Sequence, residues 1–280
     1  MFDFISWQLE KNGIDLLGKL PLDECKLTRP YLLEKAGIKS GTAILFAVPY
    51  LIDDGKQGNL SEYAKSRDYH LFFKKLFEET LPLLQGAFPN NKFIGFTDHS
   101  PIDEIAAAAK SGIGIIGSNG LLITEKYSSF VFIGEIITDA ELECNVGEIK
   151  VCENCGLCKS LCPARLCKAE CLSAITQKKG TLSPSEIELM QRNNTVWGCD
   201  ICQSVCPHTQ KAIKNGTIYS NIDFFKVSRT PYITYETIRN MSDEDFKSRA
   251  YSWRGKDVIL RNLELFQSNR LLPEEDHTEG

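Results

Sequence analysis

The sequence predicts an α+β protein: a domain around one sheet, then a cysteine-rich module, then short C-terminal helices. Between residues 40 and 140, apolar β-branched runs alternate with amphipathic segments, which is typical of helices packed on a sheet. Nine of the eleven cysteines lie between Cys152 and Cys206, and after Pro207 the apolar residues recur at helical spacing. We therefore expect three consecutive parts, at 1–145, 146–212 and 213–280.

The elements of the first part follow from local patterns. Residues 43–52 are apolar without interruption, as in a buried strand, and residues 92–98 and 128–138 are expected to be further strands. The segment 69–84 places its apolar residues along one face of a helix. Residues 101–110 open with a proline and are followed by glycines, which predicts a short helix.

The other segments carry weaker signals, and the glycine-rich stretch 111–120 separates the last helix of the first part from its last strand. We expect short helices within 1–40, a polar loop at 53–70, a linker at 141–150, helices at 234–251 and 257–267, and a disordered tail at 271–280.

Composition narrows the class of protein. The 280 residues are 42% hydrophobic and 25% charged, which is ordinary for a soluble globular protein. No apolar run reaches the ~18–20 residues of a membrane span, and the N-terminus lacks the pattern of a signal peptide, so we expect a cytoplasmic protein. There, cysteines indicate metal or redox chemistry rather than disulfides. The net charge of −5 argues against non-specific nucleic-acid binding as the main task.

The first cysteine motif is Cys152-x2-Cys155-x2-Cys158-x3-Cys162-Pro163. This is the full run of bacterial ferredoxins, in which three thiolates bind one [4Fe–4S] cluster and the fourth ligates a second cluster. The motif therefore predicts a ferredoxin-like module with two clusters, which moves single electrons.

The second motif, Cys199-x2-Cys202-x3-Cys206-Pro207, has Val196 where its first ligand would stand. By reciprocity with the first motif, Cys206 completes the first cluster. The expected first set is Cys152, Cys155, Cys158 and Cys206, and the second is Cys162, Cys199, Cys202 and one further thiolate. Between the motifs, Cys167 and Cys171 are available, and the short spacing of Cys167 from Cys162 favours Cys171.

Two zinc sites are the alternative, since C-x2-C pairs also bind zinc. Zinc sites prefer two separated pairs of this kind. They give no reason for a duplicated x3-Cys-Pro step, so the sequence favours iron–sulfur clusters.

The cysteine module, joined to the segments before it, resembles the epoxyqueuosine reductase family. The R-D-Y-H, F-x-D-x-x-P and glycine-rich I-G elements in series are far more specific than the ferredoxin motif alone. The matching stretches are YAKSRDYH (63–70), FTDHSPIDEIAAAAKSGIGIIGSNGLLI (96–123), SSFVFIGEIITD (128–139), CLSAIT (171–176), WGCDICQSVCP (197–207) and, more weakly, FKSRAYSWRGKDVILRN (246–262).

The resemblance implies a second cofactor and a reaction. A base-off cobalamin would lie between an N-terminal α/β corrinoid-binding domain and the ferredoxin-like module, with no protein ligand to the cobalt. Electrons from a small external donor, such as a flavodoxin or ferredoxin, would pass through both clusters to give cob(I)alamin. That corrinoid would serve the two-electron reduction of the epoxide of epoxyqueuosine in tRNA, giving queuosine and water. We expect a monomer that binds its tRNA transiently.

Asp98 matches the proposed proton donor of this family, in the F-x-D-x-x-P element. An acid is needed because an opening epoxide or a departing hydroxyl must be protonated. The alternative is that Asp98 caps the helix beginning near Pro101, and the resemblance favours the catalytic role.

Matching position by position also implies the corrinoid contacts and the eighth cluster ligand. The contacts are Ser61, Asp98, Leu122, Ile133, Leu172 and the pair Cys199–Asp200. Leu122 and Ile133 would otherwise be read as core residues. The match of CLSAIT supports Cys171 as the eighth ligand, which leaves Cys25, Cys144 and Cys167 as structural thiols.

The sequence departs from the family pattern in three places. The N-terminal region offers no counterpart of an upstream arginine that contacts the corrinoid. Residues 112–118 read GIGIIGS where the family has G-x-G-W-x-G-K, and the C-terminal helical-repeat domain that grips tRNA has no counterpart within the 280 residues. Phosphate contacts could instead come from a basic face, or these residues are merely solvated: Arg165, Lys168, Lys178, Lys179, Arg249, Arg254, Lys256 and Arg261.

Two other functions fit parts of the pattern. One is a ferredoxin-like electron carrier or corrinoid-reactivating protein without substrate chemistry of its own. The other is a reductive dehalogenase-like enzyme, against which the absence of an export signal and the R-D-Y-H element argue. An acid at a site open to substrate would favour the reductase over the carrier.

Overall fold

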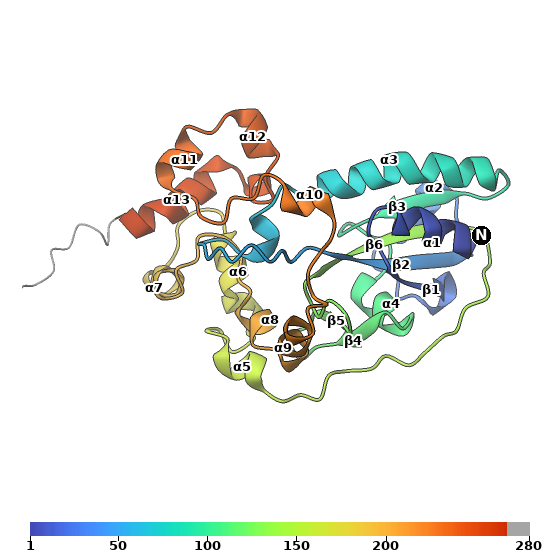
Figure 1. Ribbon diagram of the computed structural model, residues 1–280, viewed down its shortest axis with the longest axis horizontal. Helices are drawn as coiled ribbons and strands as arrows, with labels where there is room; N and C mark the ends of the chain where they lie inside the picture. The colour runs from blue at the N-terminus through green and yellow to red at the C-terminus, as the bar shows by residue number, and fades with distance from the viewer. Residues whose placement is uncertain (268–280) are drawn as a thin grey trace, which may run out of the picture. The chain divides into compact units, whose positions relative to one another are not determined.

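The computed structural model describes residues 1–267, so the tail expected to be disordered, 271–280, lies outside the described residues. The chain divides into two compact units, coloured along the chain in Figure 1. The first unit comprises Met1–Asp53, Tyr69–Leu161 and Ile201–Val227. The second comprises Asp54–Asp68, Cys162–Asp200 and the described part of Ser228–Gly280.

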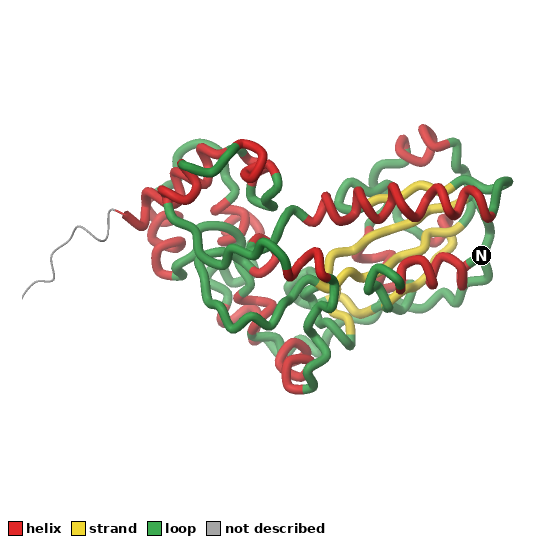
Figure 2. Tube along the Cα trace, turned by 45° about the horizontal axis from the view of Figure 1, so that its top comes forward, coloured by secondary structure: helices red, strands yellow, loops and turns green. Residues whose placement is uncertain are grey.

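A four-stranded antiparallel sheet forms the centre of the first unit, in the order β1-β2-β6-β3 (Figure 2, yellow). Its strands are β1 (Leu16–Pro21), β2 (Thr42–Pro49), β3 (Phe93–Phe96) and β6 (Val131–Thr138). The three strands predicted from the sequence are confirmed. The edge strand β1 replaces part of the helical region expected within 1–40, because its backbone pairs with β2 along its whole length. The antiparallel pairing confirms the α+β class.

Helices cover both faces of this sheet, α3 (Tyr69–Ala87) on one and α4 (Glu104–Lys110) on the other (Figure 1). Strand β2 is buried on both sides, which is why its sequence does not alternate. On the α3 face, the rings of Phe46 and Phe73 lie 6.1 Å apart, and on the α4 face Leu45 belongs to the same core cluster as the alanines of α4.

The expected helix 101–110 begins later than predicted. Asp103 is the N-cap of α4, and its side chain accepts a hydrogen bond from the backbone N–H of Ala106 at 3.3 Å. Pro101 therefore precedes the helix instead of opening it. The remaining helices that border the sheet are α1 (Phe2–Glu10) and α2 (Tyr31–Ala36).

The glycine-rich stretch contains a small hairpin that the sequence did not predict, formed by β4 (Gly114–Ile116) and β5 (Leu122–Thr124). Gly114 is required there, since a Cβ atom would come within 2.4 Å of the carbonyl oxygen of Ile123. Residues 141–150 contain no helix or strand. The unit ends in short helices, α5 (Leu157–Leu161), α8 (Ile201–Ser204), α9 (Pro207–Lys214) and α10 (Asp223–Lys226).

Helices dominate the second unit: α6 (Leu172–Thr176), α7 (Pro184–Arg192), α11 (Tyr235–Arg239), α12 (Asp243–Lys247) and α13 (Lys256–Gln267). The helix expected at 234–251 is split in two, because Ser242 caps a new helix by accepting the N–H of Asp245 at 3.1 Å. Helix α13 confirms the one expected at 257–267. Trp197 and Tyr251, both fully buried, lie at the centre of this unit's core. Within residues 1–267, no helix is long and apolar enough to cross a membrane.

Candidate active site and cysteine cavity

Asp98 lies at the centre of a tight turn that directly follows β3. The N–H of His99 donates to the carbonyl oxygen of Thr97 at 2.6 Å, and Asp98 between them has a φ of 58°. A left-handed residue in a three-residue turn is strained, at a cost of roughly 1–3 kcal/mol. The turn is held down by Thr97, whose hydroxyl donates to the carbonyl oxygen of Ile133 at 3.0 Å.

Two residues at the start of α3 contact the Asp98 carboxylate. The hydroxyl of Tyr69 donates to Oδ2, and Nε2 of His70 lies 3.3 Å from the same oxygen. The Tyr69 ring is stacked on Phe132, with ring centroids 4.0 Å apart. The R-D-Y-H element and the F-x-D element, 29 positions apart at Tyr69 and Asp98, are therefore one constellation.

The electrostatics of Asp98 favour the ionised form. Partial burial raises its pKa, but the hydrogen bonds from His70 and Tyr69 and the charge of His70 outweigh it, so the pKa lies below 3.8. Its side chain is about half exposed, at 49%. The N-cap of the following helix is Asp103, so the alternative reading of Asp98 as that cap was wrong.

Two glutamates that sequence reasoning missed lie behind this turn. The Glu104 carboxyl faces the backbone N–H of Asp98, and Glu135 accepts a hydrogen bond from the hydroxyl of Ser100 at 2.7 Å. Glu135 has no exposed surface. The signal was present in the sequence as one acid inside the apolar run SSFVFIGEIIT.

Leu122 and Ile133, the expected corrinoid contacts of this unit, are both buried and belong to one core cluster. Leu122 begins β5, while Ile133 lies in β6 and is joined to the Asp98 turn through Thr97. Their positions fit the core role that the sequence left open, and the contact of Ile133 also ties it to the turn.

One cavity of the first unit collects the four thiols expected to hold the first cluster. Cys152, Cys155, Cys158 and Cys206 all line a hollow of about 410 Å³. Among the described residues, no three His, Cys, Asp or Glu side chains are grouped to hold a single metal ion. A cubane presents its irons at separate corners, so four soft thiolates spread around one cavity are the donor set that it needs.

Ser118, from the altered glycine-rich element, contacts this cavity. Its backbone N–H donates to Sγ of Cys152 at 3.2 Å, and its hydroxyl lies 3.2 Å from the same sulfur. Burial raises the pKa of Cys152, but these hydrogen bonds and one from the backbone of Asn154 lower it by more, so that the pKa lies below its ordinary value. Ser118, where the family pattern has lysine, therefore supports the thiolate form that binds iron.

The second cysteine set is divided between the units. Cys162, Cys171 and Cys199 belong to the second unit and Cys202 to the first. Cys171 directly precedes α6, and Cys167 is exposed. This set, including the choice of Cys171, stays a prediction.

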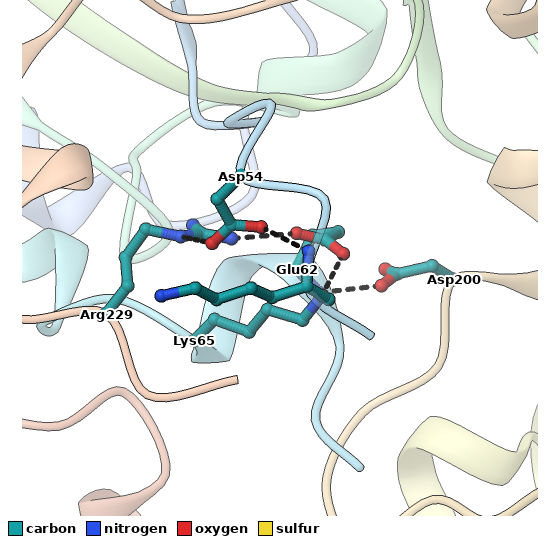
Figure 3. Close-up of polar contacts among 6 residues, drawn as sticks. Asp54, Glu62, Lys65, Asp200 and Arg229 are labelled. Carbon is teal, nitrogen blue, oxygen red and sulfur yellow. Dashed lines mark hydrogen bonds and ion pairs between the residues drawn. The ribbon is translucent and has the colours of Figure 1, made fainter. Parts of the chain in front are cut away.

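Within the second unit, Ser61 and Asp200 lie close together although they are far apart in the sequence. The N–H of Ser61 donates to the carbonyl oxygen of Trp197 at 2.9 Å. The N–H of the next residue, Glu62, donates to Oδ2 of Asp200 at 2.7 Å, as Figure 3 shows. Gly198 has a φ of 75°, and a Cβ atom there would lie 1.9 Å from the Ser61 hydroxyl. Only glycine fits this approach.

An ion-pair network that the sequence did not reveal fixes the loop carrying Ser61 (Figure 3). Arg229 is almost fully buried and contacts Oδ2 of Asp54 at 2.8 Å and Oε2 of Glu62 at 3.1 Å. Lys65, also buried, pairs with Glu62. Because the network holds Glu62, it also holds the backbone N–H that Asp200 accepts.

Leu172 completes this grouping in the second unit. It is buried at the start of α6, in a cluster against which Cys199 packs. At the other end of α6, the Thr176 hydroxyl accepts the N–H of Gly198 at 3.0 Å. Ser61, Leu172 and Asp200, three of the expected corrinoid contacts, are thus gathered around the backbone of residues 197–200.

Six of the eight expected basic residues fall into two groups. Lys168, Lys178 and Arg254 line one cavity of about 690 Å³ in the second unit. The Arg254 guanidinium lies 3.8 Å from the ring centroid of Trp253, which is 57% exposed. In contrast, the side chains of Arg249, Lys256 and Arg261 donate hydrogen bonds to backbone carbonyl oxygens of the same unit.

Comparison with known proteins identifies the family. An epoxyqueuosine reductase from Gloeobacter violaceus is 32% identical over 224 residues, which are 75% of this chain and 69% of that protein. The chain belongs to the epoxyqueuosine reductase family. Another member, from Lactococcus garvieae, is 28% identical over 74% of this chain and 61% of its own length. No protein-family model matches the sequence.

Solved structures of the family share the fold. The structure of epoxyqueuosine reductase from Streptococcus thermophilus matches with a TM-score of 0.79 and 23% identity, covering 96% of this chain and 81% of that one. An epoxyqueuosine reductase crystallised with an epoxyqueuosine-modified tRNA stem loop matches with a TM-score of 0.75 and 23% identity, covering 94% and 80%. Because the family consists of oxidoreductases, membership in it supports the prediction that this chain is an enzyme and not the alternative of an electron carrier.

Proposed function

We propose that this chain reduces the epoxide of epoxyqueuosine in tRNA to queuosine, with two [4Fe–4S] clusters and cobalamin. The observation that carries the proposal is the carboxylate of Asp98, half exposed and held between Tyr69 and His70. Such a group belongs to a site where protons are moved to a substrate. The chain spans 69% and 61% of the two curated relatives, so the activity of those whole proteins is carried over as a proposal.

The residues fit the proposed cofactors. Four thiols around one cavity suit the first cluster, and Cys162, Cys171, Cys199 and Cys202 would hold the second. The hydroxyl oxygen of Ser61 is buried without a hydrogen-bond partner among the described residues, so a polar group of a bound corrinoid would satisfy it. When bound, the clusters and corrinoid supply the electrons, delivered from a small external donor. Asp200, Leu172, Leu122 and Ile133 complete the proposed corrinoid contacts.

The protein's own groups supply the protons. Removing the epoxide oxygen as water consumes two electrons and two protons. Because the pKa of Asp98 is lowered, this carboxylate must take up a proton again before each proton transfer. His70, whose Nε2 lies 3.3 Å from Oδ2 of Asp98, can supply that proton in its imidazolium form. Tyr69 fixes the same oxygen of Asp98, so that the proton leaves from a defined position.

The basic cavity of the second unit supports a nucleic-acid substrate. Lys168, Lys178 and Arg254 line one hollow, where Lys178 is paired with Glu186, so that Lys168 and Arg254 carry the positive charge offered to phosphate. The exposed ring of Trp253 beside them is suited to stacking on an unpaired base. We infer that tRNA binds here with few phosphate contacts and dissociates readily.

The test is anaerobic reconstitution of the full chain with iron, sulfide and cobalamin, followed by an assay on tRNA containing epoxyqueuosine. Mass spectrometry of the digested tRNA should show loss of one oxygen atom from the modified base. Reaction mixtures without cobalamin are the matched control and should show no conversion. A protein that binds both clusters but no corrinoid, and leaves the tRNA unchanged, would be a carrier instead.

A further inference from the structure

Two glutamates lie beneath the turn that carries Asp98, and the proposed reaction does not use them. Glu135 lies in β6 with no exposed surface, paired in register with Phe96 at the end of β3. Glu104 is the first residue of α4, and its carboxyl faces the backbone N–H of Asp98, which favours the ionised form of that carboxyl. We call Glu104 and Glu135 the acid pair.

Each member of the acid pair has one carboxyl oxygen that is sealed from solvent. Among the described residues, neither Oε2 of Glu104 nor Oε1 of Glu135 has a hydrogen-bond partner. The other oxygen of Glu135 is well held, since the hydroxyl of Ser100 donates to it at 2.7 Å. A buried carboxylate with an unsatisfied oxygen is costly, whereas a protonated carboxyl carries a donor of its own. The geometry therefore favours a bound proton.

The charges that face Glu104 point the same way. The negative charges of Asp98 and Asp103 repel its ionised form, while the backbone N–H of Asp98 and the charge of Arg29 favour it. Burial is the largest effect, and together these raise the pKa of Glu104 to about 7.

Among the described residues, no positively charged group is among those that shift the pKa of Glu135. Burial raises its pKa most, repulsion from Glu104 adds to this, and the hydrogen bond from Ser100 lowers it only in part, so that it reaches about 8. The nearby Cys25 is a neutral thiol, because burial and the charge of Glu135 raise its pKa to about 12. Neither Glu104 nor Cys25 therefore supplies a positive charge that would stabilise an ionised Glu135.

We propose that the acid pair holds a proton at neutral pH and thereby positions Asp98, with Glu104 acting as a positioning residue through the Asp98 backbone. The inference rests on the proposed catalytic role of Asp98. With the pair neutral, the Glu104 carboxyl faces the N–H of the strained turn without adding charge. Once the pair ionises, a negative charge beneath the turn raises the proton affinity of Asp98 and makes it a poorer acid.

Infrared difference spectroscopy of the full, cluster-loaded chain tests the bound proton without an activity assay. Protonated carboxyls absorb apart from carboxylates, and ¹³C labelling of glutamate marks the residue type. We expect a protonated glutamate band at about pH 6.5, where ordinary glutamates with a pKa of about 4.3 are ionised. The band should weaken in Glu104→Gln and in Glu135→Gln and persist in Glu78→Gln, a control that changes an exposed glutamate of α3.

A wild-type chain without this band, or a band that survives both substitutions together, would overturn the proposal. Because the readout needs no substrate, it still reports on the acid pair if the proposed reaction fails.

The pH profile of turnover separates positioning from a merely structural role. Glu104→Gln keeps an acceptor for the Asp98 N–H but cannot ionise, so the fall in rate on the alkaline side should move to higher pH. Glu104→Ala removes the acceptor and should lower the rate about tenfold at every pH. Identical profiles for the wild type and Glu104→Gln would contradict the positioning role.

Discussion

The hydroxyl of Tyr69 donates a hydrogen bond to Oδ2 of Asp98. This contact joins the first turn of α3 to the strained turn after β3, and His70 approaches the same oxygen. The carboxylate is therefore fixed by one helix, while its turn is fixed through Thr97 and faced from below by the Glu104 carboxyl. The predictions below test this arrangement and the cysteine cavity separately.

Removing the tyrosine hydroxyl should change the titration of Asp98. Tyr69→Phe deletes a hydrogen bond that lowers the Asp98 pKa, so we expect that pKa to rise toward its usual range. A carboxylate whose pKa is lowered by folding stabilises the fold at pH values above its unfolded-state pKa. That stabilisation is lost as the pH falls through its folded-state pKa. The variant should therefore lose less stability on acidification, measured by urea unfolding between about pH 5 and 2. Tyr31→Phe, which alters a contact with His99, should behave as the wild type.

The cysteine cavity makes a prediction about metal content. Cys206→Ser removes one of the four thiols that line it, so reconstituted protein should hold about four irons instead of about eight. Cys167→Ser changes an exposed cysteine outside both expected ligand sets and should keep the full complement. Iron and sulfide analysis with electron paramagnetic resonance of the reduced protein checks both. Equal iron in the two variants would refute the assignment of Cys206.

Ser118 should affect the reduction potential of the first cluster. Its hydroxyl contact with Cys152 stabilises the more negatively charged, reduced state, so Ser118→Ala should lower the reduction potential. A hydrogen bond to a charged group is worth ~1.5–3 kcal/mol, and if about half of it differs between the redox states the shift is roughly 40 mV for one electron. Redox titration of the reconstituted chain measures this. A potential that stays the same or rises would show that the hydroxyl does not act on the cluster.

The buried Glu135 should make stability depend on pH in the alkaline direction. Folding raises the pKa of this carboxyl from 4.5 to about 8. Such a group stabilises the fold fully at pH values below its unfolded-state pKa, and the stabilisation is lost as the pH rises toward its folded-state pKa. Glu135→Gln does not titrate, so its stability relative to the wild type should grow by about 3 kcal/mol between about pH 4.5 and 7. Urea midpoints at several pH values check this, and Glu78→Gln is the matched control. A constant difference across the range would mean that Glu135 is ionised.

Much of the architecture could be predicted because β2, α3 and α13 have strong local patterns. The edge strand β1 could not, since its strand structure depends on pairing with β2 and not on its own sequence. The hairpin of β4 and β5 was hidden by glycines that a close backbone approach requires. A break such as the cap at Ser242 depends on a single side chain within a helical pattern.

The candidate site was predictable only in part, for a similar reason. Motif spacing brought out the first four thiols and Asp98, because their chemistry demands fixed residue types. The turn at Asp98 and the buried Glu104 and Glu135 depend on how distant segments pack, which no local pattern records. Likewise, the contact between Ser61 and the backbone at Trp197 joins segments far apart in the chain.

The most direct test of the account compares two aspartates of one loop in the reconstituted chain, acting on tRNA that contains epoxyqueuosine. Asp98→Asn keeps the size of the side chain but carries no proton to give, whereas Asp103→Asn keeps a good helix cap at the start of α4. Single-turnover rates should fall about 10²- to 10⁴-fold for Asp98→Asn and stay close to the wild type for Asp103→Asn. Queuosine formed at the wild-type rate by Asp98→Asn would contradict the account.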